Sequence, residues 1–194
     1  MSKKRPTEVI RADGPIRHNR TTGELMIMTD ELPSSSRSYV AQVVRVSTMG
    51  DSVQFSFGQV VQPPRRLLSV AVVETTVASL RKLHETLTSE FRDSARRLGK
   101  SSESLVLTDG EVGSLAADRF FVAYANISRM TITDMGSQVD WFQLEPAEVR
   151  RIAGGGAHRD SIMAPLTVMM SSDLLITLIE QIDLAFAAAS GSSR

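Results

Sequence analysis

The alternation of apolar and polar residues predicts three strands in the first half of the chain. Residues 39–47 and 67–74 are rich in β-branched residues, a composition typical of strands. Residues 52–61 alternate with a period of two, so we expect one face of this strand to be buried. Two glycines add local detail: Gly50 indicates a turn, and Gly58 indicates a bulge within the strand. The side chains expected on the buried face are Val53, Phe55 and Phe57.

A helical period begins directly after the third of these strands. Thr75 and Thr76 offer hydroxyl groups that can cap the first turn of a helix. Leucines recur at helical spacing after them, which predicts one buried stripe and a charged opposite face. We expect this helix to continue past Ala95 and to end near Gly99, because glycine is a common residue at helix C-termini.

The same order of elements follows in the second half of the chain. Three strands precede a second helix, for which Ser171 and Ser172 are the candidate caps. A turn is expected at residues 134–137, and a longer loop at residues 145–161. The strands are expected over residues 120–133, 138–144 and 164–170, and the helix over residues 173–189.

The two halves can be aligned with each other. Residues 39–41 match residues 121–123, Val53 matches Val139, and Val70 matches Leu166 in the third strand. One such unit has too few elements to cover both faces of its sheet, whereas two can cover each other. We therefore expect an α+β protein in which two related β-β-β-α units, with antiparallel sheets packed by helices, form a pseudo-dimer. Chance agreement between two ordinary α+β segments is the alternative.

The N-terminal segment differs in composition from the rest of the chain. It is rich in charged residues and has little apolar surface to bury, so we expect most of it to be mobile. Its one apolar stretch, residues 24–29, is the candidate for a short edge strand. The segment either stays solvated or becomes ordered on a partner. The expected organisation is a mobile arm at residues 1–38, a first unit at 39–98, a connection at 99–118, a second unit at 119–189 and a flexible C-terminus at 190–194.

The second helix is apolar on almost all sides. Such a helix is buried on most of its surface, either within its own domain or against another chain. The second reading makes it a candidate interface between protein chains. The interface residues expected on this basis are Leu175, Ile176, Ile179, Leu184 and Phe186.

The first unit resembles a family of small bacterial domains of unknown function. The residues that carry the resemblance are the aromatic start at Tyr39, the element Val44-Arg45-Val46 and the Phe57-Gly58-Gln59 end of the second strand. The second unit departs from this pattern. The order of three strands and a helix is also similar to the subunit of SecB-type export chaperones. Neither resemblance implies a catalytic residue.

Composition narrows the classes of function. The chain has 194 residues, 42% of them hydrophobic, and 22 basic residues balance 22 acidic ones. This balance argues against a dedicated nucleic-acid or anionic-membrane protein, because such proteins usually carry excess lysine and arginine. There are no cysteines, so disulfides, cysteine-ligated metals and thiol nucleophiles are absent. We see neither a signal peptide nor an apolar stretch of membrane-spanning length, and therefore expect a soluble cytoplasmic protein without membrane contacts.

One loop has polar functional potential. The glycines at residues 154–156 lack the Lys-Ser/Thr pair of a phosphate-binding loop, so a flexible loop is the better interpretation. The candidates for an anion or partner contact in this region are Arg150, Arg151, His158 and Arg159. No pattern typical of a nucleophile, a metal site or a cofactor site stands out, so we expect no catalytic residue and no cofactor.

These observations favour a non-catalytic protein-interaction or assembly module that associates with itself. One alternative is a SecB-like holding chaperone that binds unfolded polypeptides through apolar grooves. Another is a small-ligand binder or enzyme that uses the loop at residues 150–160. The candidate partners are therefore other proteins or further copies of the chain.

Overall fold

The computed structural model describes residues 9–10, 16–19, 25–28, 31–61, 66–88, 121–133, 136–153 and 162–191. The chain divides into two compact units. The smaller unit consists of Met1–Ser34 and Gln143–Met163, and the larger unit consists of Ser35–Phe142 and Ala164–Arg194.

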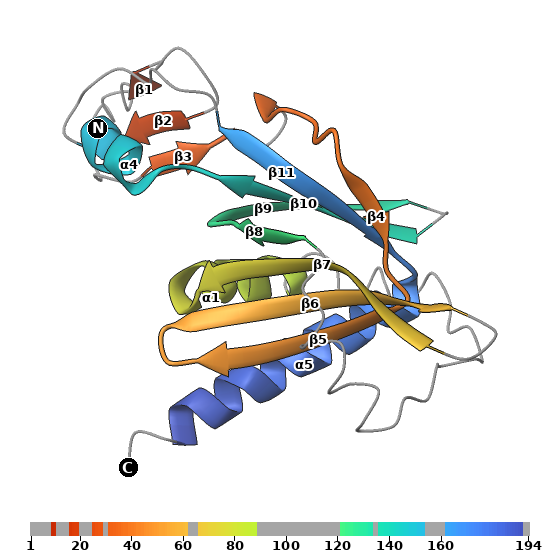
Figure 1. Ribbon diagram of the computed structural model, residues 1–194. Helices are drawn as coiled ribbons and strands as arrows, with labels where there is room; N and C mark the ends of the chain where they lie inside the picture. Colours follow the sequence, from red (N-terminus) through yellow and green to blue (C-terminus); the bar gives the residue numbers. More distant parts are fainter. Residues whose placement is uncertain are drawn as a thin grey trace, which may run out of the picture. The chain divides into compact units, whose positions relative to one another are not determined.

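The larger unit contains two four-stranded mixed sheets, which makes the protein α+β as expected (Figure 1). Its first sheet has the order β5-β6-β7-β8, and its second sheet has the order β4-β11-β10-β9. The strands of the first sheet are β5 (Val43–Met49), β6 (Ser52–Val61), β7 (Arg66–Thr76) and β8 (Val122–Tyr124). Those of the second sheet are β4 (Ser38–Val40), β9 (Ile127–Thr133), β10 (Gly136–Gln143) and β11 (Met163–Met170).

Each sheet contains one short strand that comes from the other half of the chain; we call these two, β4 and β8, the borrowed strands. β8 pairs in parallel with β7, and β4 pairs in parallel with β11. Two predictions are corrected by this arrangement. The single strands expected at residues 39–47 and 120–133 are each two strands, and the two members of each pair belong to different sheets. The sheets are also mixed rather than wholly antiparallel, because the borrowed strands run parallel to their neighbours.

The backbone hydrogen bonds of the two halves correspond closely. They match when Ala41 is laid on Ala125 and Ala71 on Leu166, a different register from the one expected from sequence. In this register Arg45 falls on Arg129 and Gln54 on Gln138. The matched bonds are Gln42 N to Gly58 O with Asn126 N to Phe142 O, Val72 N to Phe121 O with Thr167 N to Arg37 O, and Ala125 N to Glu74 O with Ala41 N to Met169 O.

Glycine positions shape the first antiparallel meander. Gly50 has a φ of 60° and occupies the first position of the two-residue loop between β5 and β6. A positive φ at this position suits the right-handed twist of a hairpin, and glycine adopts it without steric cost. The pairing of β6 with β7 shifts register between Phe57 and Gly58, because β7 has one extra residue there, Val70. The irregularity lies beside Gly58, as expected, but the extra residue belongs to β7 rather than to the strand that contains the glycine.

The core of the larger unit lies where the inner faces of both sheets meet the helices. The Phe55 and Trp141 rings are 5.1 Å apart between centroids, and the Phe57 and Trp141 rings are 6.3 Å apart. Val53, Phe55 and Phe57 are fully buried, as their alternation predicted. The expectation that only this face is buried is corrected, because Gln54 and Ser56 on the other face are buried as well. Leucines and isoleucines from both helices of this unit belong to the same cluster.

The two helices of the larger unit begin at the predicted caps. α1 (Val77–Thr86) is capped by Thr76, whose side chain accepts a hydrogen bond from Ser79 N. α5 (Ser172–Gly191) follows Ser171, whose hydroxyl accepts one from Leu174 N at 3.2 Å. These bonds satisfy backbone donors that a helix leaves unpaired in its first turn. The predicted continuation of the first helix towards Gly99 lies outside the described residues.

A glutamine attaches α5 to the edge of the first sheet. Gln181 Oε1 accepts a hydrogen bond from Val46 N at 2.7 Å, and Gln181 Nε2 donates one to Val44 O at 3.0 Å. The side-chain amide thus takes the place of a neighbouring strand along β5. Because unpaired strand edges promote aggregation, this contact both docks the helix and protects the edge.

The smaller unit contains a three-stranded antiparallel sheet and a helix. The sheet has the order β1-β2-β3. With the two helices of the larger unit, this helix completes the three helices of the described residues, and it lies between them in the sequence. The strand expected at residues 24–29 is present as β3, and two further strands precede it. The loop expected at residues 145–161 is corrected, because its first part is helical. The bounds are β1 (Val9–Ile10), β2 (Ile16–Asn19), β3 (Leu25–Ile27) and α4 (Pro146–Ala153).

None of the described helices combines the length and the apolar character that a membrane span requires.

Substitution of Gly136 tests how closely β10 approaches the end of β11 in the second sheet. It has a φ of 134°, and a Cβ atom there would lie 2.7 Å from Met170 O. Gly136→Ala should therefore lower the free energy of unfolding by about 1–3 kcal/mol, measured by urea denaturation. Gly50→Ala is the matched control, because its φ is also positive but no atom lies within 4 Å of the added Cβ. Equal losses in the two variants would contradict the close approach of Gly136 to β11.

Candidate interaction surface

Four exposed aliphatic side chains gather where the two sheets of the larger unit meet at β4. We call this group the sheet-edge patch; its members are Val40, Val61, Leu68 and Met169. Each is between 38% and 49% exposed, although each belongs to a strand. Large apolar side chains exposed together, rather than singly, are typical of interaction surfaces.

Strand register and one glutamine join the patch. Val40 and Met169 are direct neighbours in the parallel pair of β4 and β11. On the other sheet, Leu68 is the register partner of Gln59, and Val61 lies on the same face two residues beyond Gln59. Gln59 Nε2 donates a hydrogen bond to Val40 O at 2.6 Å. The ends of β6 and β7 are therefore held beside β4, which brings the two pairs of exposed side chains to the same junction.

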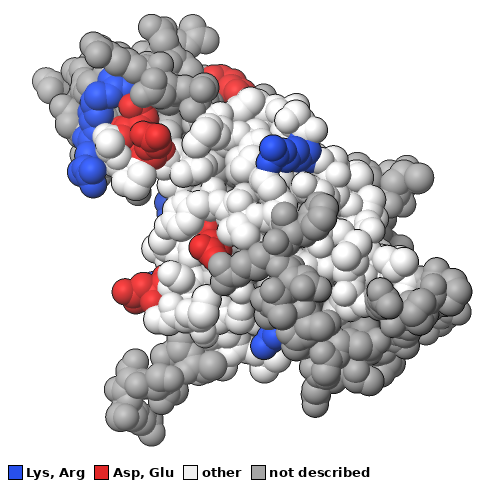
Figure 2. Space-filling view, in the orientation of Figure 1, with Lys and Arg blue, Asp and Glu red and all other residues white. Residues whose placement is uncertain are grey.

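A second glutamine holds the same junction. Val60 N donates a hydrogen bond to Gln42 Oε1 at 2.8 Å, so the end of β6 is tied to the chain between β4 and β5. The patch thus rests on backbone fixed at two points. Figure 2 shows few charged side chains on the described strands of the face in view.

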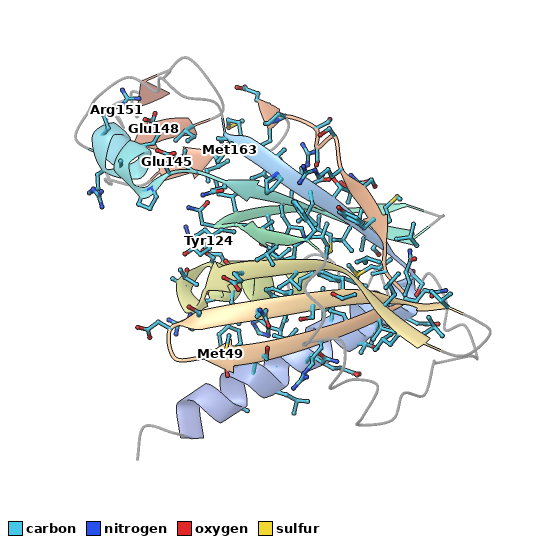
Figure 3. All side chains as sticks on the ribbon, in the orientation of Figure 1. Met49, Tyr124, Glu145, Glu148, Arg151 and Met163 are labelled. Atoms are coloured by element: carbon cyan, nitrogen blue, oxygen red, sulfur yellow. The ribbon has the colours of Figure 1, made fainter. Side chains whose placement is uncertain are left out.

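β8 carries a separate pair of exposed apolar side chains. Val122 and Tyr124 are 43% and 45% exposed, whereas Ala123 between them is buried. Tyr124 is labelled beside β8 in Figure 3. In the register that matches the backbone bonds of the two halves, Tyr124 corresponds to Val40. Exposed apolar residues therefore occur on both borrowed strands.

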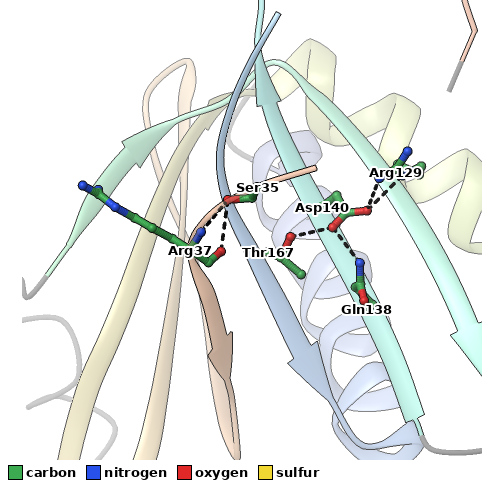
Figure 4. A network of polar contacts seen from close by, with 6 residues as sticks. All are labelled: Ser35, Arg37, Arg129, Gln138, Asp140 and Thr167. Carbon is green, nitrogen blue, oxygen red and sulfur yellow. Dashed lines mark hydrogen bonds and ion pairs between the residues drawn. The ribbon is translucent and has the colours of Figure 1, made fainter. Parts of the chain in front are cut away.

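A buried polar network stiffens the second sheet (Figure 4). Asp140 is only 3% exposed. Its Oδ2 accepts hydrogen bonds from Arg129 Nε at 2.9 Å and Nη2 at 2.7 Å. Its Oδ1 accepts bonds from Gln138 Nε2 at 2.8 Å and from Thr167 Oγ1 at 2.6 Å. The carboxylate links β9, β10 and β11, and its four bonds leave little capacity for a ligand.

The predicted interface on α5 is mostly interior in the structure. Leu175 and Ile179 are almost fully buried in the core, and Ile176 and Phe186 pack against it. Leu184 is 69% exposed and is the one member of the five that faces outward. Its exposed neighbours on α5 are Thr177, Glu180 and Asp183, so this face of the helix is mainly polar. The structure therefore moves the candidate interface from α5 to the sheet-edge patch.

The predicted polar loop is only partly described. Arg150 is an exposed residue of α4, and Arg151 Nη2 donates to Glu148 Oε1 at 2.5 Å within the same helix. Glu148 itself is buried, so this ion pair has a structural role in the smaller unit. His158 and Arg159 lie outside the described residues, and an anion contact there stays a prediction.

His84 of α1 contacts two side chains of α5. Its Nε2 lies 2.5 Å from Asp183 Oδ1, and its ring meets the edge of the Phe186 ring. These contacts join the two helices of the larger unit. No group of three or more His, Cys, Asp or Glu residues that could hold a metal ion occurs among the residues described.

Comparisons with known proteins add no relative. No family model, curated protein sequence or solved structure matches the chain.

The sheet-edge patch was not predicted from sequence. Val40 and Met169 belong to different halves of the chain and look like ordinary strand residues. The one sequence signal was the pair of glutamines, Gln42 and Gln59, placed among β-branched residues near the ends of two strands. Polar side chains at such positions commonly bond to free backbone groups.

Proposed function

We propose that this protein is a non-catalytic interaction module that associates with itself through the sheet-edge patch. The observation that carries the proposal is the group of four exposed aliphatic side chains on a rigid junction of two sheets. Surfaces of this kind bind proteins because burial of the apolar area is favourable.

The arrangement of the strands supports association of the chain with further copies of itself. Each half of the larger unit gives a short strand to the sheet of the other, with matching backbone bonds. We infer that the halves arose by duplication of one β-β-β-β-α unit that paired with a second copy of itself. The present chain is then a pseudo-dimer, and its outer surface is available for a further level of assembly. The predicted domain boundaries, N-terminal docking arm and cytoplasmic location stay predictions.

The size of the patch indicates weak association. Complete burial of one aliphatic side chain contributes roughly 1.5–3 kcal/mol, and these side chains are already half buried. Together they would contribute about 4 kcal/mol, which corresponds to a millimolar Kd before the loss of rotational freedom is counted. The interface therefore needs further surface around the patch, and we expect dimers to form at micromolar to millimolar concentrations.

A lysine placed in the patch should weaken this association. Val40→Lys and Met169→Lys each put a charge where the partner chain would bury an aliphatic group, and we expect the Kd to rise at least tenfold. Sedimentation velocity over a range of concentrations measures the change. Thr177→Lys, on the exposed face of α5, adds the same charge elsewhere and should leave the Kd unchanged. If all three variants sediment like the native chain, the patch is not the interface.

A holding chaperone is the second candidate, favoured by one observation. Three of the exposed large apolar side chains are methionines, Met49, Met163 and Met169. Methionine adapts its shape to varied partners and is common on promiscuous binding surfaces. A chaperone should suppress the aggregation of an unrelated unfolded protein at an equimolar ratio, followed by light scattering. No suppression at that ratio removes this candidate.

A further inference from the structure

The edges of the two large sheets are treated in different ways. The β5 edge is occupied by the Gln181 side chain, which bonds to Val46 N and Val44 O. On the β4 edge, the outward carbonyl of Val40 accepts a bond from Gln59. The β9 edge carries a charged residue and several hydroxyls in its sequence, Ile-Ser-Arg-Met-Thr-Ile-Thr. Side-chain caps and polar residues are the usual means by which proteins discourage pairing at an edge.

The β8 edge differs from these three. Its parallel pairing with β7 uses Phe121 O, which accepts from Val72 N at 2.7 Å, and Ala125 N, which donates to Glu74 O at 2.9 Å. In a parallel pair, every second residue of a strand directs both its N–H and its C=O group towards the neighbouring strand. The backbone groups of Ala123, midway between Phe121 and Ala125, therefore point towards β7. The N–H and C=O groups of Val122 and Tyr124 therefore point away from the sheet. Among the described residues, no hydrogen bond reaches those groups.

The side chains at this edge are apolar. Val122 and Tyr124 lie on one face and are both more than two-fifths exposed, whereas Ala123 faces the core. Outward backbone donors and acceptors, flanked by apolar side chains at alternate positions, complement an extended polypeptide segment with the same alternation. Addition of a strand to an exposed sheet edge is a common mode of peptide recognition.

We propose that the β8 edge binds an extended apolar segment of a partner polypeptide as a fifth strand of the first sheet. The fold itself provides the precedent, because β4 and β8 are three-residue segments that extend a sheet made by the other half of the chain. Backbone bonds give the affinity, and contacts with Val122 and Tyr124 select apolar side chains on one face of the segment. This site is separate from the sheet-edge patch and does not depend on self-association.

Proline substitution can block the edge selectively. The N–H of Val122 points away from β7, so Val122→Pro removes an outward donor without removing a bond of the sheet. Ser38→Pro is the matched control, because Ser38 occupies the corresponding position of β4. Tyr124→Lys is a second variant, which keeps the backbone and places a charge on the edge. Urea denaturation of each variant verifies that the fold is retained.

The probe is a fluorescein-labelled peptide of eight residues in which valine and threonine alternate between terminal lysines. Fluorescence anisotropy of the full-length chain measures binding, and hydrogen exchange measures protection of the Val122 and Tyr124 amides. We expect the peptide to protect both amides, Val122→Pro and Tyr124→Lys to weaken binding at least tenfold, and Ser38→Pro to bind like the native chain. The same peptide with a central proline should not bind.

Three results would overturn the proposal. The Val122 and Tyr124 amides could be as protected in the free chain as those of the core, which would mean that the edge is already covered. Val122→Pro and Tyr124→Lys could bind the peptide as well as the native chain does. Val122→Pro could instead change the sedimentation of the chain alone, which would identify a second copy of the chain as the occupant. Loss of self-association in patch variants tests the proposed function separately.

Discussion

Replacing Asp140 with alanine is expected to lower the free energy of unfolding by about 3–5 kcal/mol, the cost of removing one partner of a buried ion pair. The carboxylate is 3% exposed and accepts four hydrogen bonds from Arg129, Gln138 and Thr167. Without it, the guanidinium group and two polar side chains would remain beside the sheet without their acceptor. Urea denaturation, followed by the fluorescence of the single tryptophan, measures the loss.

Glu180→Ala is the control for this variant. Glu180 is exposed on α5, so its removal changes the net charge by the same amount without disturbing a network. Substitutions at such surface positions usually change stability by less than about 0.5 kcal/mol. A loss in Asp140→Ala no larger than that in Glu180→Ala would show that the carboxylate does not hold the sheet together.

Replacing Trp141 with alanine is expected to have a comparable effect, about 3–5 kcal/mol. The indole ring contacts Phe55 and Phe57 across the two sheets and is 2% exposed. Its removal would leave a cavity at the centre of the larger unit, whose lining cannot fully collapse. Because the variant lacks tryptophan, unfolding should be followed by circular dichroism.

Trp141→Phe distinguishes the contribution of the aromatic ring to stability from that of the indole N–H group. The buried Trp141 Nε1 has no hydrogen-bond partner among the described residues, so phenylalanine removes a donor that contributes no bond. Phe57 already occupies the position that corresponds to Trp141 in the first half. We therefore expect Trp141→Phe to cost clearly less than Trp141→Ala, because phenylalanine keeps one aromatic ring and leaves a smaller cavity. A loss as large as that of Trp141→Ala would indicate that Nε1 has a polar role.

Local features of the fold could be predicted from the sequence because they depend on local chemistry. The alternation in residues 52–61 identified the side chains that belong to the core, although the polar face of the strand is buried as well. Hydroxyl residues identified the caps of both long helices. Gly58 marked the place of a register shift, although the extra residue, Val70, lies in the partner strand β7. Each of these signals depends on residues a few positions apart, whose periodicity or backbone freedom is visible in the sequence.

The exchange of strands could not be predicted in the same way. Residues 39–47 form an uninterrupted β-branched run, although β4 and β5 belong to different sheets. Nothing in the periodicity of a strand specifies its neighbour. The alignment of the halves was also shifted, because it matched residue types rather than hydrogen-bonding positions.

Prediction of the candidate site required the strand order, which the sequence does not specify. A helix buried within its own domain and a helix that presents apolar side chains to another chain have the same residue pattern in sequence. Leu175 and Ile179 were therefore assigned to an interface, although they belong to the core. Conversely, Val40 and Met169 become neighbours only because β4 crosses to the second sheet. The surface is therefore a product of the topology, and four ordinary strand residues form it.

Hydrogen exchange of the full-length chain at low and high concentration tests the central claim, self-association through the sheet-edge patch. It reports both whether the chain associates and which segments are covered. We predict that protection of residues 38–42, 58–61 and 66–69 increases with concentration while that of α5 stays constant. Exchange that is independent of concentration, or a gain confined to residues 172–191, would contradict this account.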